Sequence, residues 1–316
     1  MTPEELFNIC RRNGRRPAIA ECRGSAVIAV CGMEGRLFYI HAGKVISLFR
    51  PEAAENTSSS RRGYFNPGGD GLWPAPEGTC LGYEYPTGKW RVPAGIVGAQ
   101  YEVTEQNAAT LVITAEIDLV NDRQLGLPCR FTRRVEVAEE PGGTTVIEQH
   151  DEIEYLGSRP LAKGEFMLAP WSLSQFAVGP TARACFGDPG TRVRDLYQPS
   201  GDLLTHDGNT IVMRPDDARR IQAALPEESR FVRLRLPEKG IEITRTSPPL
   251  APGLTWADIA DAAPDRDPAG EVRYSIYNDP SGFMELEVVG GCPETLVAGT
   301  ILGVDIVNRI TKFMED

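Results

Sequence analysis

The sequence predicts an all-β protein, a sandwich of two large antiparallel sheets with one short helix at its N-terminus. Short runs rich in Val, Ile, Phe and Tyr recur along most of the 316 residues, and these residue types favour strands. Turn residues, mainly Gly and Pro, separate the runs, which is typical of consecutive hairpins. Helical periodicity is almost absent beyond the N-terminal segment. Many strands joined by such turns build large antiparallel sandwiches.

The N-terminal segment carries the signals of a helix start. Thr2 suits the N-cap position, Pro3 the first helical position, and Glu5 completes a capping box with Thr2. The helix is expected to end near Asn13, which a glycine follows.

Residues 17–316 are expected to form a single β-sandwich domain, because no sharp change in composition divides them, and residues 1–16 a helical extension. A short helix is predicted at 216–224. The expected strands span residues 18–22, 25–31, 36–41, 44–49, 99–103, 110–119, 129–138, 144–155, 182–186, 210–213, 231–236, 240–246, 273–277, 283–289 and 300–307.

Composition excludes several classes of protein. The net charge of −11 argues against nucleic acid and anionic membranes as partners, since both need a basic footprint. No run of 18 apolar residues occurs and no signal peptide is visible. The seven cysteines are scattered without a CxxC motif, which is typical of reduced thiols in a cytoplasmic protein. None of the three histidines stands at ligand spacing to a cysteine, which argues against a zinc site. No metal or other cofactor is expected, although Asp70, Glu77 or the late glutamates could hold a hard cation.

The segment 66–78 is the most unusual part of the chain. It holds four glycines, three prolines, two carboxylates and one tryptophan. Such a composition predicts a rigid irregular loop rather than a helix or a central strand. The loop would present Asp70, Trp73 and Glu77 together, and an aromatic ring beside carboxylates suits a sugar. The alternative is a tight surface turn with Trp73 tucked into the core.

A second irregular segment, residues 82–98, carries Tyr83, Tyr85, Trp90 and Arg91 among prolines and glycines. Long irregular loops in a compact domain are uncommon and often functional. Two such loops in succession indicate a binding cleft, with Arg91 among its candidate substrate-binding residues.

Two glutamates lie two residues apart in the expected strand 283–289. Strand alternation places Glu285 and Glu287 on one face. If that face lines a cleft, the carboxylates repel and one of them gains a raised pKa. It could then act as a general acid or base near neutral pH. The alternative is a solvated edge face.

Three further side chains are candidates. His150 lies between acidic residues on the expected strand 144–155, and neither face of that strand is cleanly apolar, so we expect only partial coverage. A hydrogen-bonded structural histidine is the alternative to a catalytic one. Trp171 offers an aromatic face, with core packing as its alternative. Gln175 lies in an apolar run, where a buried amide needs a partner.

Four segments together resemble a known family. The stretch Asn66-Pro-Gly-Gly-Asp-Gly-Leu-Trp-Pro-Ala-Pro-Glu-Gly78 is similar to the Gly-Gly-Asp-x-x-Trp-x-x-Pro-Glu loop of bacterial mutarotase-like proteins in the galactose mutarotase (aldose 1-epimerase) superfamily. In the same order, residues 155–160 resemble an Asn-x-Gly-like turn of that family, residues 168–175 its Trp-x-x-x-Gln strand, and residues 283–290 its late Glu-Leu-Glu strand. The likeness covers residues 18–310.

The resemblance implies a β-supersandwich whose concave face binds a sugar. True mutarotases open the pyranose ring with a glutamate base on a late strand and a histidine acid. Glu287, or its neighbour Glu285, falls near the place of that glutamate. The histidine does not carry over, because Pro170-Trp171 stands where the epimerases have an Asn-His pair. His150 would replace it only if the fold brings His150 into the cleft.

These observations support three hypotheses. The first is a carbohydrate-binding, mutarotase-like protein, an isomerase of the aldose 1-epimerase type if it is an enzyme, with a small carbohydrate as its partner. The second is a glycan-processing hydrolase or lyase that uses a carboxylate pair across the cleft. The third is a non-catalytic sugar-binding or structural module.

Overall fold

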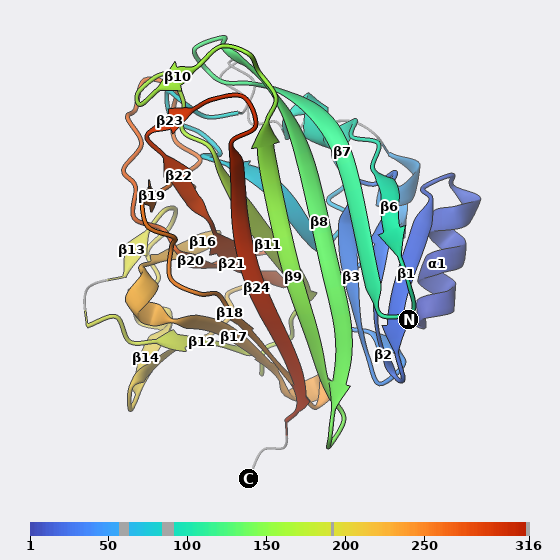
Figure 1. Cartoon of the computed structure of the whole chain (residues 1–316). Coiled ribbons are helices and arrows are strands. Elements are labelled where there is room, and N and C mark those ends of the chain that lie inside the picture. The colour runs from blue at the N-terminus through green and yellow to red at the C-terminus, as the bar shows by residue number, and fades with distance from the viewer. Residues whose placement is uncertain (57–62, 84–91, 191–192, 314–316) are drawn as a thin grey trace.

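The structure is a computed structural model that describes residues 1–56, 63–83, 92–190 and 193–313. Two ten-stranded antiparallel sheets make up most of it, which confirms the predicted all-β sandwich. In Figure 1 the long strands β7, β8, β9 and β24 lie side by side, and the helix α1 stands on the flank beside β1.

The first sheet has the strand order β1-β2-β3-β5-β11-β21-β20-β16-β13, with β4 paired to β3. Its strands come from distant parts of the chain, so its centre joins residues near position 70 to residues near 170 and 285. The bounds are β1 Pro17–Cys22, β2 Ser25–Val30, β3 Arg36–His41, β4 Lys44–Val45, β5 Asp70–Ala75, β11 Ala169–Ala177, β13 Arg194–Asp195, β16 Ile221–Leu225, β20 Tyr274–Asp279 and β21 Phe283–Val289.

The second sheet has the order β14-β15-β12-β17-β18-β24-β9-β8-β7-β6. The bounds are β6 Glu102–Gln106, β7 Thr110–Val120, β8 Gly126–Glu140, β9 Thr144–Tyr155, β12 Arg183–Gly187, β14 Leu204–Asp207, β15 Thr210–Met213, β17 Phe231–Leu236, β18 Ile241–Thr246 and β24 Ile301–Lys312. Two small pairs complete the strands: β10 Leu161–Ala162 with β23 Thr295–Leu296, and β19 Leu254–Trp256 with β22 Gly291–Pro293.

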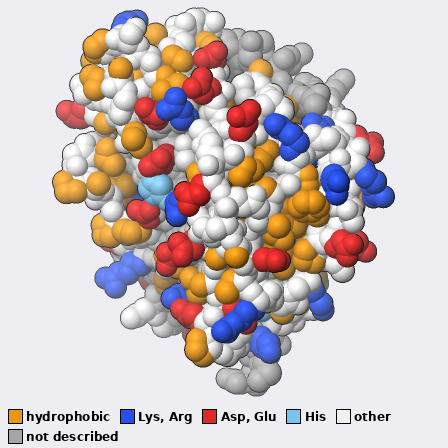
Figure 2. All heavy atoms as spheres, turned by 45° about the vertical axis from the view of Figure 1, so that its right-hand side comes forward, with side chains coloured by type: hydrophobic (Ala, Val, Ile, Leu, Met, Phe, Trp, Pro, Cys, Tyr) orange, Lys and Arg blue, Asp and Glu red, His pale blue; other side chains and the backbone are white. Residues whose placement is uncertain are grey.

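The helices are short. The α-helices are α1 Pro3–Arg12 and α2 Ala94–Val97, and the 3₁₀ turns are η1 Pro51–Glu55, η2 Gly201–Leu203, η3 Glu227–Ser229 and η4 Pro237–Lys239. None of the helices in the described parts of the chain combines the length and the hydrophobicity that a membrane span requires. On the face drawn in Figure 2, acidic, basic and hydrophobic side chains are interspersed.

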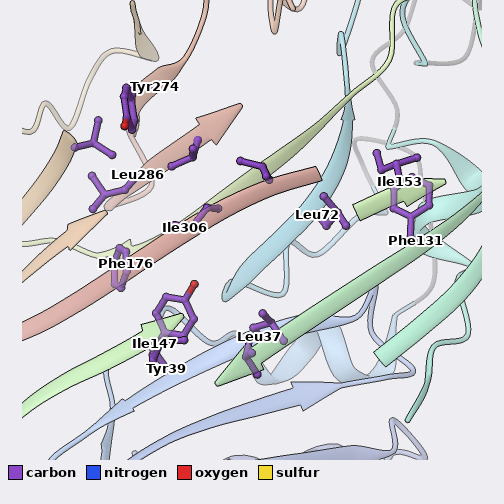
Figure 3. Close-up of a cluster of buried hydrophobic side chains, with 14 of the residues drawn as sticks. Leu37, Tyr39, Leu72, Phe131, Ile147, Ile153, Phe176, Tyr274, Leu286 and Ile306 are labelled. Carbon is purple, nitrogen blue, oxygen red and sulfur yellow. The ribbon is translucent and has the colours of Figure 1, made fainter. Parts of the chain in front are cut away.

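The main core lies between the two sheets. Alternation along each strand turns every second side chain inward. The first sheet contributes Leu72, Phe176 and Leu286, and the second contributes Phe131 and Ile147, all of them at most 1% exposed. Figure 3 shows these side chains spread along the cluster among the strands. Burying each stabilises the fold by about 1.5–3 kcal/mol, so the core holds the sheets together.

The predicted N-terminal helix forms as α1. The Thr2 hydroxyl accepts a hydrogen bond from the Glu5 amide at 3.2 Å, and the Glu5 carboxylate accepts one from the Thr2 amide at 2.8 Å. Leu6 and Cys10 are buried in a second hydrophobic cluster with Phe38 of β3. The helix therefore covers the outer face of the first sheet at one end and leaves the centre of that face to other elements.

A buried ionic cluster also joins the sheets. Asp70 of β5 accepts hydrogen bonds from Arg133 of β8, from Gln149 of β9 at 3.0 Å and from Ser172 of β11, and it pairs with Arg245 of β18 at 3.0 Å. Burial opposes the ionisation of Asp70, but the two guanidinium groups outweigh it and lower the pKa of this carboxyl.

Several sequence-based expectations need correction. Asp70–Ala75 is a strand inside the first sheet, not an irregular loop. Pro74 fits because it stands opposite Pro170 of β11, and because β5 pairs with β3 through the start of the strand, where Asp70 stands opposite Leu37. The two glycines before this strand make the tight approach, since a Cβ on Gly68, whose φ is +79°, would lie 2.1 Å from a backbone oxygen.

Further comparisons concern the type, the burial and the bounds of the predicted elements. The expected helix at 216–224 is a turn followed by β16, because the Asp216 carboxylate accepts hydrogen bonds from the amides of Ala218 and Arg219. The partial coverage expected for strand β9 is confirmed, because Gln149 and Asp151 on its inner face are at most 2% exposed whereas Glu148 on the other face is exposed. The expected strand 44–49 shortens to β4, and the expected strand 99–103 starts later, as β6.

Candidate functional site

A cavity of about 320 Å³ opens on the outer face of the first sheet, beside the part covered by α1. This volume lies within the usual range of small-molecule sites. Strands β5, β11, β21, β20 and β16 form its floor. The lining residues are Arg36, Tyr64, Asn66, Trp73, Glu77, Trp171, Leu173, Gln175, Tyr197, Arg220, Gln222, Tyr277, Asp279, Phe283 and Glu285.

Strand register brings the lining side chains together. Trp171 of β11 stands opposite Trp73 of β5, and Gln175 of β11 stands opposite Glu285 of β21. On the other side of β21, Glu285 pairs with Tyr277 of β20. Residues opposite each other in neighbouring strands point to the same face, so one row of side chains crosses the floor.

Aromatic rings line both sides of the cavity. Trp73 and Trp171 meet edge to face, with ring centroids 6.0 Å apart and planes at 90°. On the other side, Tyr277 lies 6.0 Å from Phe283 and 6.2 Å from Tyr197. These rings give the cavity flat apolar surfaces of the kind that sugar rings pack against, and they fix one another.

The two late glutamates form a coupled carboxyl pair on the floor. Glu285 lines the cavity, is 8% exposed and accepts a hydrogen bond from the Gln175 amide at 2.5 Å. Glu287 is fully buried, and its carboxyl accepts hydrogen bonds from the Trp171 indole and the Gln222 amide, each at 3.1 Å.

Burial raises the pKa of both carboxyls, and for Glu287 the neighbouring charge of Glu285 raises it further. The two carboxyls share a hydrogen bond, which needs a proton on one of them. Glu287 is the better holder of that proton, and Glu285 is the carboxylate that faces the cavity. The pair therefore keeps one proton to higher pH than an isolated carboxyl group does.

Two arginines stand at opposite sides of the cavity. Arg36 of β3 donates two hydrogen bonds to Glu34, at 3.0 and 2.7 Å, and lies over Gly71, where a Cβ would come within 2.7 Å of Arg36 Nη1. Arg220 stacks 3.8 Å above the Tyr197 ring and donates to the Tyr277 hydroxyl at 2.9 Å.

Five buried polar atoms of the cavity wall have no hydrogen-bond partner among the described residues. Three are donors and two are amide oxygens; they are Arg36 Nη1, Trp73 Nε1, Tyr197 Oη, Gln175 Oε1 and Gln222 Oε1. Buried polar groups are normally paired. Their concentration at one cavity fits a ligand that both donates and accepts hydrogen bonds. Within the described residues, no three His, Cys, Asp or Glu side chains are grouped as metal ligands.

Several of the side chains singled out in the sequence lie in this one cavity, namely Trp73, Glu77, Trp171, Gln175 and Glu285. Three further candidates, Glu287, Asp70 and His150, are not among the lining residues.

Glu287 lies beneath the cavity wall, covered by the side chains that donate to it. Asp70 is wholly buried in the ionic cluster on the inner face of the sheet, so its position does not fit contact with a ligand in the cavity. His150 lies on the outer face of the second sheet, where it pairs with Glu152 and Asp305. It does not replace the missing histidine in the cavity. Arg91 lies outside the described residues.

Sequence reasoning missed seven lining residues with polar groups: Arg36, Tyr64, Tyr197, Arg220, Gln222, Tyr277 and Asp279. One signal was present, because Gln222 is an amide in the apolar run Ile-Gln-Ala-Ala-Leu and invites the reasoning applied to Gln175. The others reach the cavity through non-local pairing, which the sequence alone does not display.

The architecture was compared with solved structures. A galactose mutarotase-like protein from Lactobacillus casei superposes with a TM-score of 0.58 over 93% of this chain and 100% of that chain, at 12% sequence identity. The chain has the galactose mutarotase-like fold.

Two further structures support the same fold. A galactose mutarotase related enzyme from Lactobacillus acidophilus aligns with a TM-score of 0.55 and 10% identity over 95% of this chain and 99% of that chain. An aldose epimerase homologue from C. elegans aligns with a TM-score of 0.50 and 11% identity over 95% of this chain and 99% of that chain. No protein-family model and no curated protein matches the sequence.

Proposed function

We propose that the cavity binds a monosaccharide-sized carbohydrate and that the chain interconverts its anomers by acid/base chemistry, as an aldose 1-epimerase-type isomerase. The observation that carries the proposal is the meeting, in one cavity, of the coupled carboxyl pair with five unpartnered polar atoms. The mutarotase-like fold is consistent with it, because the similar solved structures are described as mutarotase-like or epimerase-like proteins.

A sugar suits both the unpartnered polar atoms and the aromatic rings of the cavity wall. Its hydroxyls donate and accept hydrogen bonds, so they can pair with the donors Trp73 and Tyr197 and with the amide oxygens of Gln175 and Gln222. Its C–H faces pack on the tryptophan rings. The unpartnered atoms are already buried, so a sugar gives them hydrogen bonds that the empty cavity lacks.

Glu285 is the proposed base. Its carboxylate takes the proton of the anomeric hydroxyl. The electron pair of that O–H bond forms the second bond of the C1 carbonyl, and the bond from C1 to the ring oxygen breaks. The ring oxygen keeps that electron pair and must receive a proton. After rotation about the C1–C2 bond, the reverse steps close the ring on either face of the carbonyl.

Tyr197 is the proposed acid in place of a histidine. Its hydroxyl has no partner among the described residues, and burial raises its pKa, so it holds its proton until negative charge develops on the ring oxygen. The Arg220 guanidinium above its ring favours the phenolate that forms. Glu287 is a positioning residue, since it touches Glu285 and not the cavity.

The decisive experiment follows the optical rotation of freshly dissolved α-D-glucose and α-D-galactose. The Glu285→Gln variant keeps the shape and the hydrogen bond to Gln175 but has no basic oxygen. We expect its rate above the spontaneous background to fall at least about 100-fold, the usual contribution of a general base. Glu102→Gln, an exposed change on β6, serves as the matched control. Equal rates for wild type and Glu285→Gln would refute the assigned base.

A glycan-processing enzyme is the second candidate, because Glu77 and Glu285 line the same cavity. A hydrolase needs two carboxyl groups flanking the scissile bond. Incubation with aryl glycosides would separate the two proposals. Release of the aryl alcohol that Glu77→Gln abolishes supports hydrolysis, and mutarotation without such release supports the isomerase.

A further inference from the structure

Two of the unpartnered donors stand side by side at the β5 side of the cavity. Arg36 Cζ lies 5.9 Å from the centroid of the Trp73 ring. Arg36 is 1% exposed, and neither its Nη1 nor the Trp73 indole N–H has a hydrogen-bond partner within the described residues. The remaining unpartnered donor, Tyr197, packs with Tyr277 and Arg220 on the other side. The two unpartnered groups on the Arg36 side are therefore both donors.

The guanidinium of Arg36 is held so that Nη1 stays unused. Glu34 takes the hydrogen bonds from Nε and Nη2, and the Tyr64 hydroxyl accepts a further one from Nη2 at 3.1 Å. Gly71 beneath it leaves the room that Nη1 occupies, since a Cβ would lie only 2.7 Å away. A buried arginine with one edge paired and the other unpaired is prepared for an acceptor.

We infer that this part of the cavity binds the carboxylate of a sugar acid, so that the substrate class is a hexuronate-type sugar rather than a neutral aldose; this rests on the function proposed above. A carboxylate only accepts hydrogen bonds, and it matches a place where both unpartnered groups donate. In a hexuronate the carboxylate and the anomeric hydroxyl stand on either side of the ring oxygen. One ring can therefore reach both Arg36 and Glu285.

Charge favours a carboxylate over a phosphate. Glu34 already offsets the charge of Arg36, and Glu285 acts electrostatically on the same guanidinium. One added negative charge is tolerated more easily than the nearly two charges of a phosphate in so buried a place.

The test is calorimetric titration of the whole chain with D-glucuronate and D-galacturonate, each beside the matching neutral hexose, and with D-glucose 6-phosphate. We expect each hexuronate to bind at least about tenfold more tightly than its hexose, the usual gain from a charge-assisted hydrogen bond. Equal binding of hexose and hexuronate would overturn the inference and leave the proposed function standing. Preference for the phosphate would overturn the carboxylate, and failure of all five sugars to bind would overturn the proposed function as well.

Two variants locate the subsite. Trp73→Phe removes the N–H and keeps an aromatic ring, and Gly71→Ala moves Arg36 Nη1 without removing any polar group. Each should lower the preference for hexuronate over hexose about tenfold. Trp256→Phe, in β19 and not among the lining residues, is the matched control and should leave the preference unchanged. A Trp73→Phe or Gly71→Ala variant that weakens hexose and hexuronate by the same factor would contradict the assignment.

Discussion

Replacing Asp70 with alanine tests whether this carboxylate supports the fold or binds a ligand. Asp70 is wholly buried between the sheets and pairs with Arg133 and Arg245. The variant is expected to lower the free energy of unfolding by about 3–5 kcal/mol, the range for breaking a buried ion pair from one side.

The size of the effect depends on which hydrogen-bond partners each arginine keeps when Asp70 is removed. Arg133 retains Asp151, to which it donates twice at 2.9 Å. Among the described residues, Arg245 retains only uncharged acceptors, the Leu286 carbonyl at 2.5 Å and the Ser172 hydroxyl at 2.7 Å. One fully buried guanidinium is thus left without a carboxylate, which is the costly part of the change.

Urea unfolding followed by tryptophan fluorescence measures this effect at pH 7. The folded state lowers the pKa of Asp70, so ionised Asp70 stabilises the fold above about pH 3.9, the pKa of aspartate in an unfolded chain. That contribution is lost as pH falls through the lower folded pKa, so the gap between the proteins should narrow in acid. Asp118→Ala, at an exposed position of β7, is the control and should stay within about 0.5 kcal/mol of wild type. An Asp70→Ala protein as stable as that control would refute the structural role.

Two further changes test the carboxyl pair and the histidine. Glu287→Gln should flatten the dependence of the free energy of unfolding on pH. The folded state raises the pKa of Glu287, so the wild-type protein loses stability as pH rises from about 4.3 through that raised pKa. Each tenfold difference in proton affinity between the folded and unfolded states corresponds to about 1.4 kcal/mol. Urea unfolding at pH 5 and pH 8 measures this, and parallel losses in both proteins would count against a shared proton. His150→Ala should leave the mutarotation rate within about twofold of wild type, because His150 pairs with Glu152 and Asp305 on the outer face of the second sheet; a loss comparable to that of Glu285→Gln would show that the cavity is not the reaction site.

The sequence alone predicts those elements whose signals lie within the element itself. The capping box at Thr2 and Glu5 is complete within one turn of chain, so no distant contact is needed to specify it. The strands β9, β15, β17 and β21 have the predicted bounds because each is a run rich in strand-forming residues that turn residues bound on both sides.

Composition gave the wrong prediction for Asp70–Ala75, where the strand depends on pairing with distant segments of the chain. Glycine and proline in Asp70–Ala75 indicate a loop, but β3 pairs with β5 at Asp70, so no described residue of β3 stands opposite Pro74 to need its missing N–H. The inward direction of Asp70 depends on Arg133 and Arg245, more than sixty and one hundred seventy positions away. No pattern within the segment contains that information.

In the candidate site, too, some features follow from local spacing and others from distant contacts. The late pair Glu285 and Glu287 could be placed on one strand face from spacing alone, but which carboxyl meets the cavity depends on Trp171 and Gln222, whose side chains cover Glu287. Those two residues come from strands on either side of the pair, and only the strand order places them there. The strand order therefore decides which of the two glutamates carries the proton. A substitution of Gln222 that removes its side-chain N–H should shift the pKa of Glu287 although both glutamates are unchanged.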